Sequence, residues 1–180
     1  ILPLSFWNRA TRADLRNHRK IVVIDGKTGW VGSQNMHRIE YEPKTFYREL
    51  MARVKGPVVL ELQAIFIGDW YLETEEDIAS PDLMPPGGDV PAGTAMAQVL
   101  PTGPDYPGGG VDVLFTNLIH TARERVVLAT PYFIPNEPLL QAMRTAVAKG
   151  VKVTLFVTST TNSVLIDRAQ QSYYEELLFS

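Results

Sequence analysis

The sequence predicts an α/β fold, and three observations support this prediction. Short apolar runs of strand length alternate with longer amphipathic runs, a pattern typical of helices packed on a largely buried sheet. The 180 residues are 45% hydrophobic and 21% charged, which is enough apolar material for a core. Glycine and proline cluster in residues 80–93 and 101–110, where we expect irregular connections. We expect residues 1–180 to fold as one domain.

Three strands and one helix are expected in the first half. Residues 19–25 and 28–33 are apolar runs on either side of an Asp-Gly turn signal. Residues 50–56 alternate between apolar and polar side chains, as a strand with one face toward solvent does. A proline then opens a helix over residues 57–72, because proline in the first turn of a helix loses no hydrogen bond.

The second half continues with helices and strands in alternation. We expect helix, strand, helix, strand and helix, in that order, at residues 111–122, 125–130, 136–150, 151–159 and 163–178. Asn136 is the expected N-cap of the middle helix, and Gly150 is the expected residue after its C-cap. A strand, a helix and a strand in this order predict a right-handed parallel crossover.

Composition and charge limit the possible functions. The absence of cysteine excludes disulfides and thiolate metal sites. The net charge of -3 argues against broad nucleic-acid binding, so no nucleic acid is expected as a partner. The longest apolar stretch, within residues 57–72, is interrupted by polar side chains and does not predict a membrane span. Because the chain lacks an initial methionine and stops within a helical pattern, we expect it to be part of a longer protein.

One histidine and one lysine stand at the head of the first expected strand. His18 and Lys20 are two residues apart, so they point to the same face, and Val22 and Ile24 continue that row toward the interior. The lysine ammonium could hold a phosphate oxygen. The imidazole beside it could supply the nitrogen that attacks phosphorus.

Two polar side chains follow the second expected strand. Ser33 and Asn35 could bind the same phosphate through a hydroxyl and an amide, and Gly32 permits close backbone approach. Pairing of the two strands would bring both sets together. The alternative is that Ser33 and Asn35 only form a turn. Asp25 precedes a glycine at the expected hairpin turn, which favours a structural role for this carboxylate.

Together these residues complete one spaced pattern, H-x-K-x4-D-x6-G-[GS]-x-N. It is filled by His18, Lys20, Asp25, Gly32, Ser33 and Asn35. A full match by chance in this chain has odds on the order of one in 10⁵. The pattern resembles the HKD motif of the phospholipase D superfamily. Four segments, the first of which contains this motif, resemble bacterial cardiolipin synthases in the family's order: NHRKIVVIDGKTGWVGSQN, VKGPVVLELQAIFIGDW, TPYFIPNEPLLQAMRTAVAKGVKVTLF and QSYYEELL.

This resemblance implies a phospholipase D-like mixed sheet flanked by helices on both faces. It also implies phosphatidyl transfer without a metal or other cofactor: a histidine attacks one phosphatidylglycerol, glycerol leaves, and a second phosphatidylglycerol accepts the phosphatidyl group to give cardiolipin. His18, Lys20 and Asp25 would be the catalytic residues of the motif, with Ser33 and Asn35 binding substrate. Whether His18 is the nucleophile or the acid that protonates the leaving glycerol stays open.

Two departures from the family concern the active site. Family members carry two HKD motifs that form one active site, whereas neither His37 nor His120 is followed by lysine at the required spacing. We therefore expect a C-terminal half with a second HKD motif as partner, and no activity from this chain alone. The family's usual Arg-Asp pair is represented here by Arg48 and Glu49, so Glu49 is a candidate to orient the histidine.

The resemblance implies a location at the bacterial inner membrane, with the catalytic part on the cytoplasmic side. Residues 9–20 hold five cationic residues and one acidic residue, which would suit anionic lipid headgroups, although a solvated charged face is the alternative. Two other functions stay open. One is a phosphodiesterase or nuclease that completes a single-motif site by homodimerisation, and the other is a phosphate-binding module without catalysis.

Overall fold

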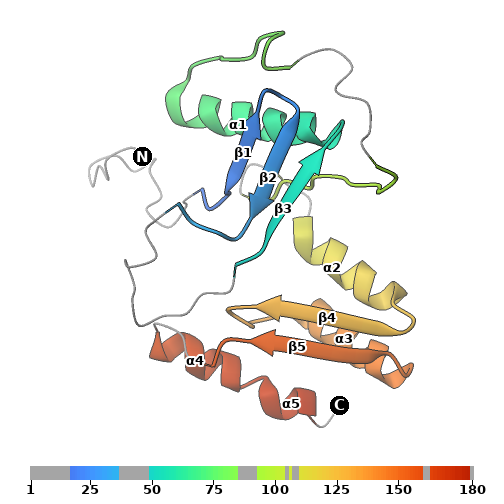
Figure 1. Cartoon of the computed structure of the whole chain (residues 1–180). Helices are drawn as coiled ribbons and strands as arrows, with labels where there is room; N and C mark the ends of the chain where they lie inside the picture. Colours follow the sequence, from blue (N-terminus) through green and yellow to red (C-terminus); the bar gives the residue numbers. More distant parts are fainter. Residues whose placement is uncertain are drawn as a thin grey trace. The chain divides into compact units, whose positions relative to one another are not determined.

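The computed structural model describes residues 17–36, 49–84, 93–103, 106, 110–159 and 163–178. The chain divides into two compact units, Ile1–Val99 and Leu100–Ser180. The first unit contains β1, β2, β3 and α1, and the second contains α2, β4, α3, β5, α4 and α5 (Figure 1). Antiparallel and parallel strand pairs are both present with packed helices, which confirms the mixed α/β class.

The first unit is built on an antiparallel sheet in the order β1-β2-β3. Its strands are β1 (Ile21–Ile24), β2 (Thr28–Gly32) and β3 (Met51–Lys55), which confirms the three expected strands with slightly shorter bounds. Asp25 and Gly26 form the turn between β1 and β2 with positive φ angles of 55° and 61°. Asp-Gly is favoured there because a tight hairpin turn requires this backbone conformation.

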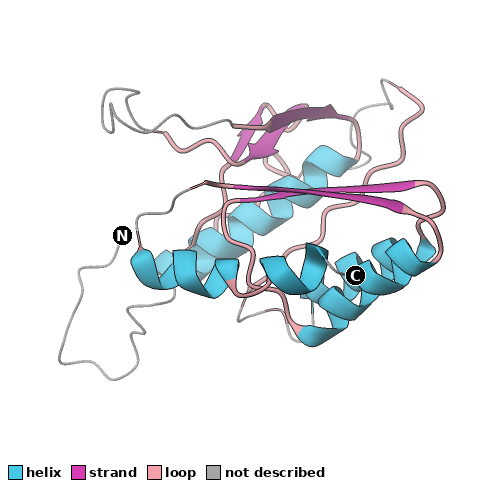
Figure 2. Ribbon diagram, turned by 90° about the horizontal axis from the view of Figure 1, so that it is seen from below, coloured by secondary structure: helices cyan, strands magenta, loops and turns pink. Residues whose placement is uncertain are grey.

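Helix α1 (Val58–Thr74) packs on one face of this sheet (Figure 1, Figure 2). Val59 and Leu62 on the helix are fully buried. The glycine at position 29 allows this close approach, because a Cβ atom there would lie 2.8 Å from the Leu62 Cδ1 atom. Gly29 is the register partner of both Val23 and Val54, so these three residues share the face under α1.

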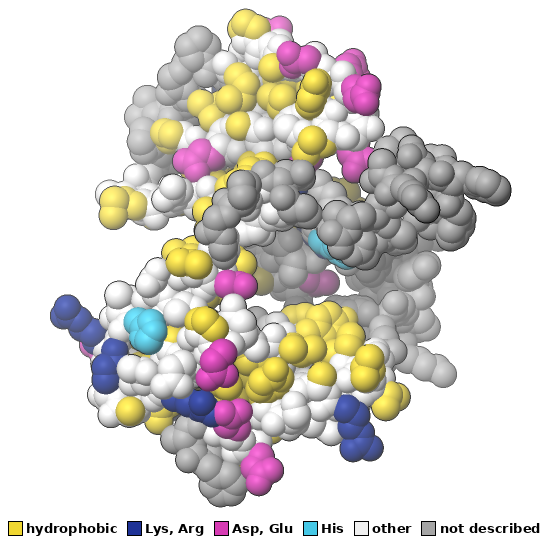
Figure 3. Space-filling view, turned by 180° about the vertical axis from the view of Figure 1, so that it is seen from behind, with side chains coloured by type: hydrophobic (Ala, Val, Ile, Leu, Met, Phe, Trp, Pro, Cys, Tyr) yellow, Lys and Arg dark blue, Asp and Glu magenta, His cyan; other side chains and the backbone are white. Residues whose placement is uncertain are grey.

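The opposite face of the sheet is open within the described part of the unit. Ile24 lies on that face and is 49% exposed. The prediction that this row of side chains points into the interior is therefore wrong at Ile24, because α1 covers the other face. Acidic side chains gather on the first unit near the end of α1, where Glu73, Glu75 and Glu76 are all exposed (Figure 3).

The second unit contains a parallel pair of strands, β4 (Arg125–Thr130) and β5 (Lys152–Val157), connected through α3 (Glu137–Ala148). This confirms the predicted strand-helix-strand order with parallel pairing. Asn136 caps α3 as predicted, because its side chain accepts a hydrogen bond from the Leu139 N–H at 3.1 Å. Gly150 follows the C-cap with a φ of 84°, a left-handed conformation that glycine adopts at little cost.

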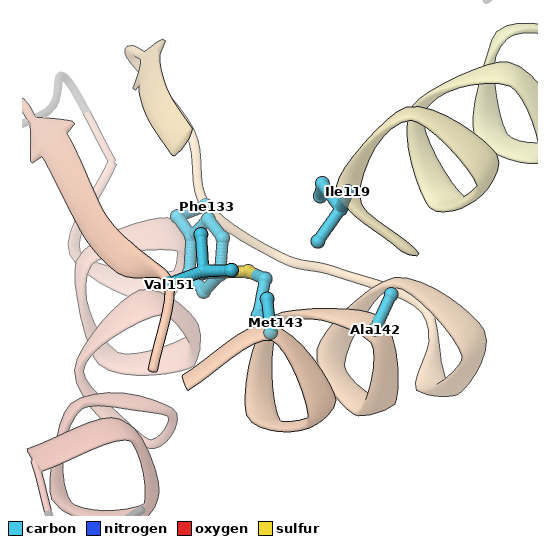
Figure 4. Packing of buried hydrophobic residues seen from close by; sticks show 6 residues of the cluster. Ile119, Phe133, Ala142, Met143 and Val151 are labelled. Carbon is cyan, nitrogen blue, oxygen red and sulfur yellow. The ribbon is translucent and has the colours of Figure 1, made fainter. Parts of the chain in front are cut away.

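The core of this unit lies on one face of the β4–β5 pair. Its buried members come from α2 (Gly110–Thr121), α3 and the neighbouring loops: Ile119, Phe133, Ala142, Met143, Ala146 and Val151 (Figure 4). Val126, Leu128, Val153 and Leu155 on the strands pack against this cluster. The alternate residues Val127 and Phe156 are 58% and 60% exposed, so among the described residues the helices cover one face only.

The prediction of one helix over residues 163–178 is wrong, because the structure has two, α4 (Val164–Gln171) and α5 (Tyr174–Leu178). At the break, the Ser172 hydroxyl donates to the Ala169 carbonyl at 2.7 Å, a local bond that competes with regular helix geometry. The Tyr173 ring packs edge-on against Phe133, with 6.2 Å between ring centroids. The break thus lets an aromatic side chain reach the core.

Candidate active site

Five of the predicted site residues lie at one end of the three-stranded sheet. Because neighbouring strands are antiparallel, the start of β1 lies beside the end of β2, which in turn lies beside the start of β3. His18 and Lys20 come just before β1, and Ser33 and Asn35 come just after β2. Glu49 precedes β3 by two residues. The β1–β2 hairpin thus brings His18 and Lys20 to the same end as Ser33 and Asn35, as the sequence predicted, and β3 adds Glu49.

The sixth residue, Asp25, lies away from the other five. It occupies the turn at the opposite end of β1, and its side chain is exposed. A four-residue strand separates this turn from the end that carries His18, which corresponds to about 13 Å. The motif therefore places one carboxylate in the hairpin turn and the cationic and polar groups at the other end.

Gly32 lies against the start of β3 with no room for a side chain. A Cβ atom at this position would lie 2.1 Å from the Leu50 carbonyl oxygen and 2.8 Å from the Met51 Cα atom. Ser33 continues this contact, since its N–H donates to the Leu50 carbonyl at 3.0 Å and its Oγ accepts from the Leu50 N–H at 2.9 Å. Gly32 therefore permits close approach of the next strand, and this approach fixes the backbone of Ser33.

The Ser33 hydroxyl is bonded to the candidate orienting carboxylate. Its Oγ donates to Glu49 Oε2 at 2.5 Å. A serine hydroxyl has a single proton to donate, so Ser33 can donate to a phosphate only after turning away from Glu49. No hydrogen bond joins Glu49 to His18 in the part of the chain that the structure describes, and the orientation of the histidine by Glu49 stays a prediction.

The Lys20 side chain folds back onto the backbone of His18. Its Nζ donates to the His18 carbonyl oxygen at 2.7 Å, which leaves two of its three N–H donors available for a phosphate. The His18 side chain is exposed, and its imidazole makes no hydrogen bond to any described residue. An imidazole nitrogen without a protein partner is free to attack an electrophile or to transfer a proton.

One residue next to this site, Asp69 on α1, was not predicted from the sequence. Its Oδ1 accepts a hydrogen bond from Arg19 Nη1 at 2.6 Å, and its Oδ2 accepts one from Asn17 Nδ2 at 2.7 Å. Both donors are direct neighbours of His18. Asn17 and Arg19 alternate with His18 and Lys20, which indicates that they point to the opposite face. The sequence alone did not show that Asp69 lies on that face.

Several sequence-based expectations lie outside the described residues, among them His37, Arg48 and the cationic residues 9–16. Within the described ranges, no cluster of three or more His, Asp or Glu residues could hold a metal ion. The helices of those ranges are also too short or too polar to cross a membrane.

The family model and two relatives that match this chain all carry the name cardiolipin synthase. A family model described as cardiolipin synthase, PLD-like domain, matches residues 115–180. The probable cardiolipin synthase YwiE of Bacillus subtilis (strain 168) is 39% identical, over 98% of this chain and 35% of its own length. Cardiolipin synthase A of Pectobacterium atrosepticum is 35% identical, over 93% of this chain and 35% of its own length. The chain thus spans about a third of the length of these relatives. No solved structure gives a significant match.

A mixed α/β chain with the HKD pattern at one end of a sheet is typical of the phospholipase D superfamily, and this chain belongs to that superfamily. Within it, the chain is a relative of the bacterial cardiolipin synthases. The resemblance drawn from the sequence is confirmed.

Replacing Glu49 tests what its bond to Ser33 does. In a protein that carries both halves of the site, we expect Glu49→Gln to keep the rate of the phosphatidyl transfer proposed below within about threefold, because glutamine retains an acceptor oxygen for the Ser33 hydroxyl. Glu49→Ala removes the acceptor, so KM should change by about threefold to tenfold, the effect of one hydrogen bond. Steady-state kinetics on phosphatidylglycerol vesicles measures both. A kcat more than tenfold lower in Glu49→Gln would instead indicate that the charge itself acts on the histidine.

Proposed function

We propose that this chain supplies half of the active site of a phosphatidyltransferase that converts phosphatidylglycerol to cardiolipin. The observation that carries the proposal is the gathering of His18, Lys20, Ser33 and Asn35 at one end of the sheet. Phosphoryl transfer needs a nucleophile, a cation and hydrogen-bond donors in one place, and these side chains provide all three. The relatives are named cardiolipin synthases, which supports the same substrate class.

In the proposed first step, an imidazole nitrogen of His18 attacks the phosphorus of phosphatidylglycerol. A phosphorus–nitrogen bond forms, and the phosphorus–oxygen bond to the glycerol headgroup breaks. The departing glycerol takes a proton from the histidine of a second HKD motif. Lys20 neutralises charge on the phosphate oxygens as the bond order changes, and Ser33 and Asn35 hold the phosphate in place.

In the second step, a glycerol hydroxyl of another phosphatidylglycerol attacks the phosphohistidine. The phosphorus–nitrogen bond breaks, cardiolipin forms, and the hydroxyl proton returns to the second histidine. The two histidines can exchange these roles without changing the products, because each step needs one nucleophile and one proton carrier. Asp25 has no role in either step and is proposed to stabilise the hairpin turn.

The remaining parts of the proposal concern what completes the site. The chain spans about a third of its relatives' length, so we propose that a C-terminal half with a second HKD motif joins it in one domain. Because the substrate is a membrane lipid, the whole enzyme would act at the inner membrane, with its catalytic part on the cytoplasmic side. No metal or other cofactor takes part in the proposed steps.

The test compares two proteins in a lipid-conversion assay with phosphatidylglycerol vesicles. One is this 180-residue chain, and the other is the same chain joined to the part of Pectobacterium atrosepticum cardiolipin synthase A that follows its matched segment. We expect cardiolipin from the joined protein only. Hydrolysis of phosphodiesters by the short chain alone would support the homodimeric phosphodiesterase instead. Phosphate binding without turnover in both proteins would support the non-catalytic module.

A further inference from the structure

We propose that Asp69 of α1 is a positioning residue that sets the direction in which His18 points. This proposal rests on the proposed function, since it assigns a partner to the histidine of that site. Asp69 does not touch the substrate in this proposal. It acts through Asn17 and Arg19, the residues on either side of His18.

The contacts of Asp69 are divided between these two residues. One carboxylate oxygen accepts from Arg19 Nη1 at 2.6 Å, and the other accepts from Asn17 Nδ2 at 2.7 Å. The side chains of Arg19 and Asp69 are only 26% and 15% exposed, so water screens this ion pair less than it screens a surface pair. The Asn17 Oδ1 atom also accepts from the Arg19 backbone N–H at 2.9 Å. One carboxylate thus ties both neighbours of His18 to the helix.

The alternation of side chains explains why this arrangement turns His18 outward. Ile21 and Val23 lie on the face of the sheet under α1, because Val23 pairs with Gly29 and Gly29 contacts the helix. Asn17 and Arg19 continue that row, and both reach α1 as expected for this face. His18 lies between them and therefore points to the opposite, open face.

The rest of the structure holds His18 only weakly. The β1–β2 ladder ends at Ile21 and Val31, so His18 lies outside it. Its imidazole has no hydrogen-bond partner among the described residues, and Lys20 holds only its backbone carbonyl. A displacement of about 1 Å in a reacting group can cost on the order of 100-fold in rate. The Asp69 contacts are therefore well placed to set the rate of attack.

Asp69 differs from the other acidic side chains toward the end of α1. Glu73, Glu75 and Glu76 are exposed, whereas the Asp69 side chain is mostly buried. Glu73→Gln is therefore a matched control, because it removes one carboxylate charge from the same helix and leaves the contacts of His18 unchanged.

The test is Asp69→Asn in the joined protein of the cardiolipin assay. Asparagine keeps the size of the side chain but presents one acceptor oxygen and no charge, so it can hold only one of the two neighbours. We expect kcat per folded molecule to fall by about 10- to 100-fold, with KM within about threefold because Ser33 and Asn35 are unchanged. Asp69→Glu should recover part of the loss, and Glu73→Gln should match the wild type.

A second readout does not depend on activity. Hydrogen exchange of the Arg19 backbone amide in the 180-residue chain should become about tenfold faster in Asp69→Asn, because Asn17 loses the partner that holds its Oδ1 against that amide. An unchanged exchange rate, or a kcat within twofold of wild type, would overturn the positioning role. Loss of all activity in the wild-type joined protein would instead overturn the proposed function, and the exchange readout would still decide the role of Asp69.

Discussion

Replacing His18 by alanine is expected to abolish phosphatidyl transfer, with a fall in rate of at least about 10³-fold. Alanine has no nitrogen that could attack phosphorus or carry a proton, so the prediction holds whichever of the two roles His18 plays. The measurement is cardiolipin formation from phosphatidylglycerol vesicles by the joined protein. Turnover like that of the wild type would remove His18 from the mechanism.

The fold should survive this substitution, because the His18 side chain is exposed and has no hydrogen-bond partner among the described residues. His120→Ala is a matched control. His120 is exposed in the last turn of α2, and the contact it makes with Lys149 Nζ uses its backbone carbonyl, which alanine retains. We expect wild-type activity from that variant. A covalent phosphatidyl adduct on the His18 ring, found by mass spectrometry, would then identify His18 as the nucleophile.

The strands and helices that were predicted most accurately are those whose bounds are marked by residues within or next to them. The strand at residues 125–130 was predicted with both of its bounds, because it is a continuous apolar run between charged residues and a proline. The helix before Gly150 was bounded by two side-chain signals, an asparagine that can cap the first turn and a glycine that can adopt positive φ. Neither signal depends on the rest of the fold.

Most of the misses depend on tertiary contacts. The break after α4 combines a local bond of Ser172 with the packing of Tyr173 against Phe133, a residue 40 positions earlier in the chain. Ile24 was expected inside because it is apolar, but only the placement of α1 decides which face of the sheet is covered. Asp69 lies 50 residues from Arg19, so their contact could not be inferred from spacing.

In the candidate site, too, local sequence predicts some features and tertiary contacts decide others. The motif spacing and the hairpin were enough to bring His18, Lys20, Ser33 and Asn35 to one end of the sheet. The partner of Glu49 could not be predicted in that way. It is set by the pairing of β2 with β3, which brings the Ser33 hydroxyl against a carboxylate 16 residues later in the chain.

Replacing Gly32 by alanine is expected to destabilise the first unit strongly. The new Cβ atom would lie 2.1 Å from the Leu50 carbonyl oxygen, and backbone cannot move aside as a flexible side chain can. The β2–β3 pair must then separate at this point, which also breaks the Ser33–Leu50 bonds. We expect a loss of about 2–4 kcal/mol of stability, and transfer activity should fall because Ser33 and Asn35 move.

Gly68→Ala in α1 is the same chemical change, but we expect it to have the opposite effect on stability. A Cβ atom at Gly68 would meet no atom within 4 Å, and glycine inside a helix is less favourable than alanine by about 0.5–1 kcal/mol. Thermal unfolding of the 180-residue chain should therefore show a lower midpoint for Gly32→Ala and a slightly higher one for Gly68→Ala. Equal midpoints for the two variants would mean that the β2–β3 contact at Leu50 is looser than the structure shows. The motif glycine would then be required by the phosphate site rather than by the neighbouring strand.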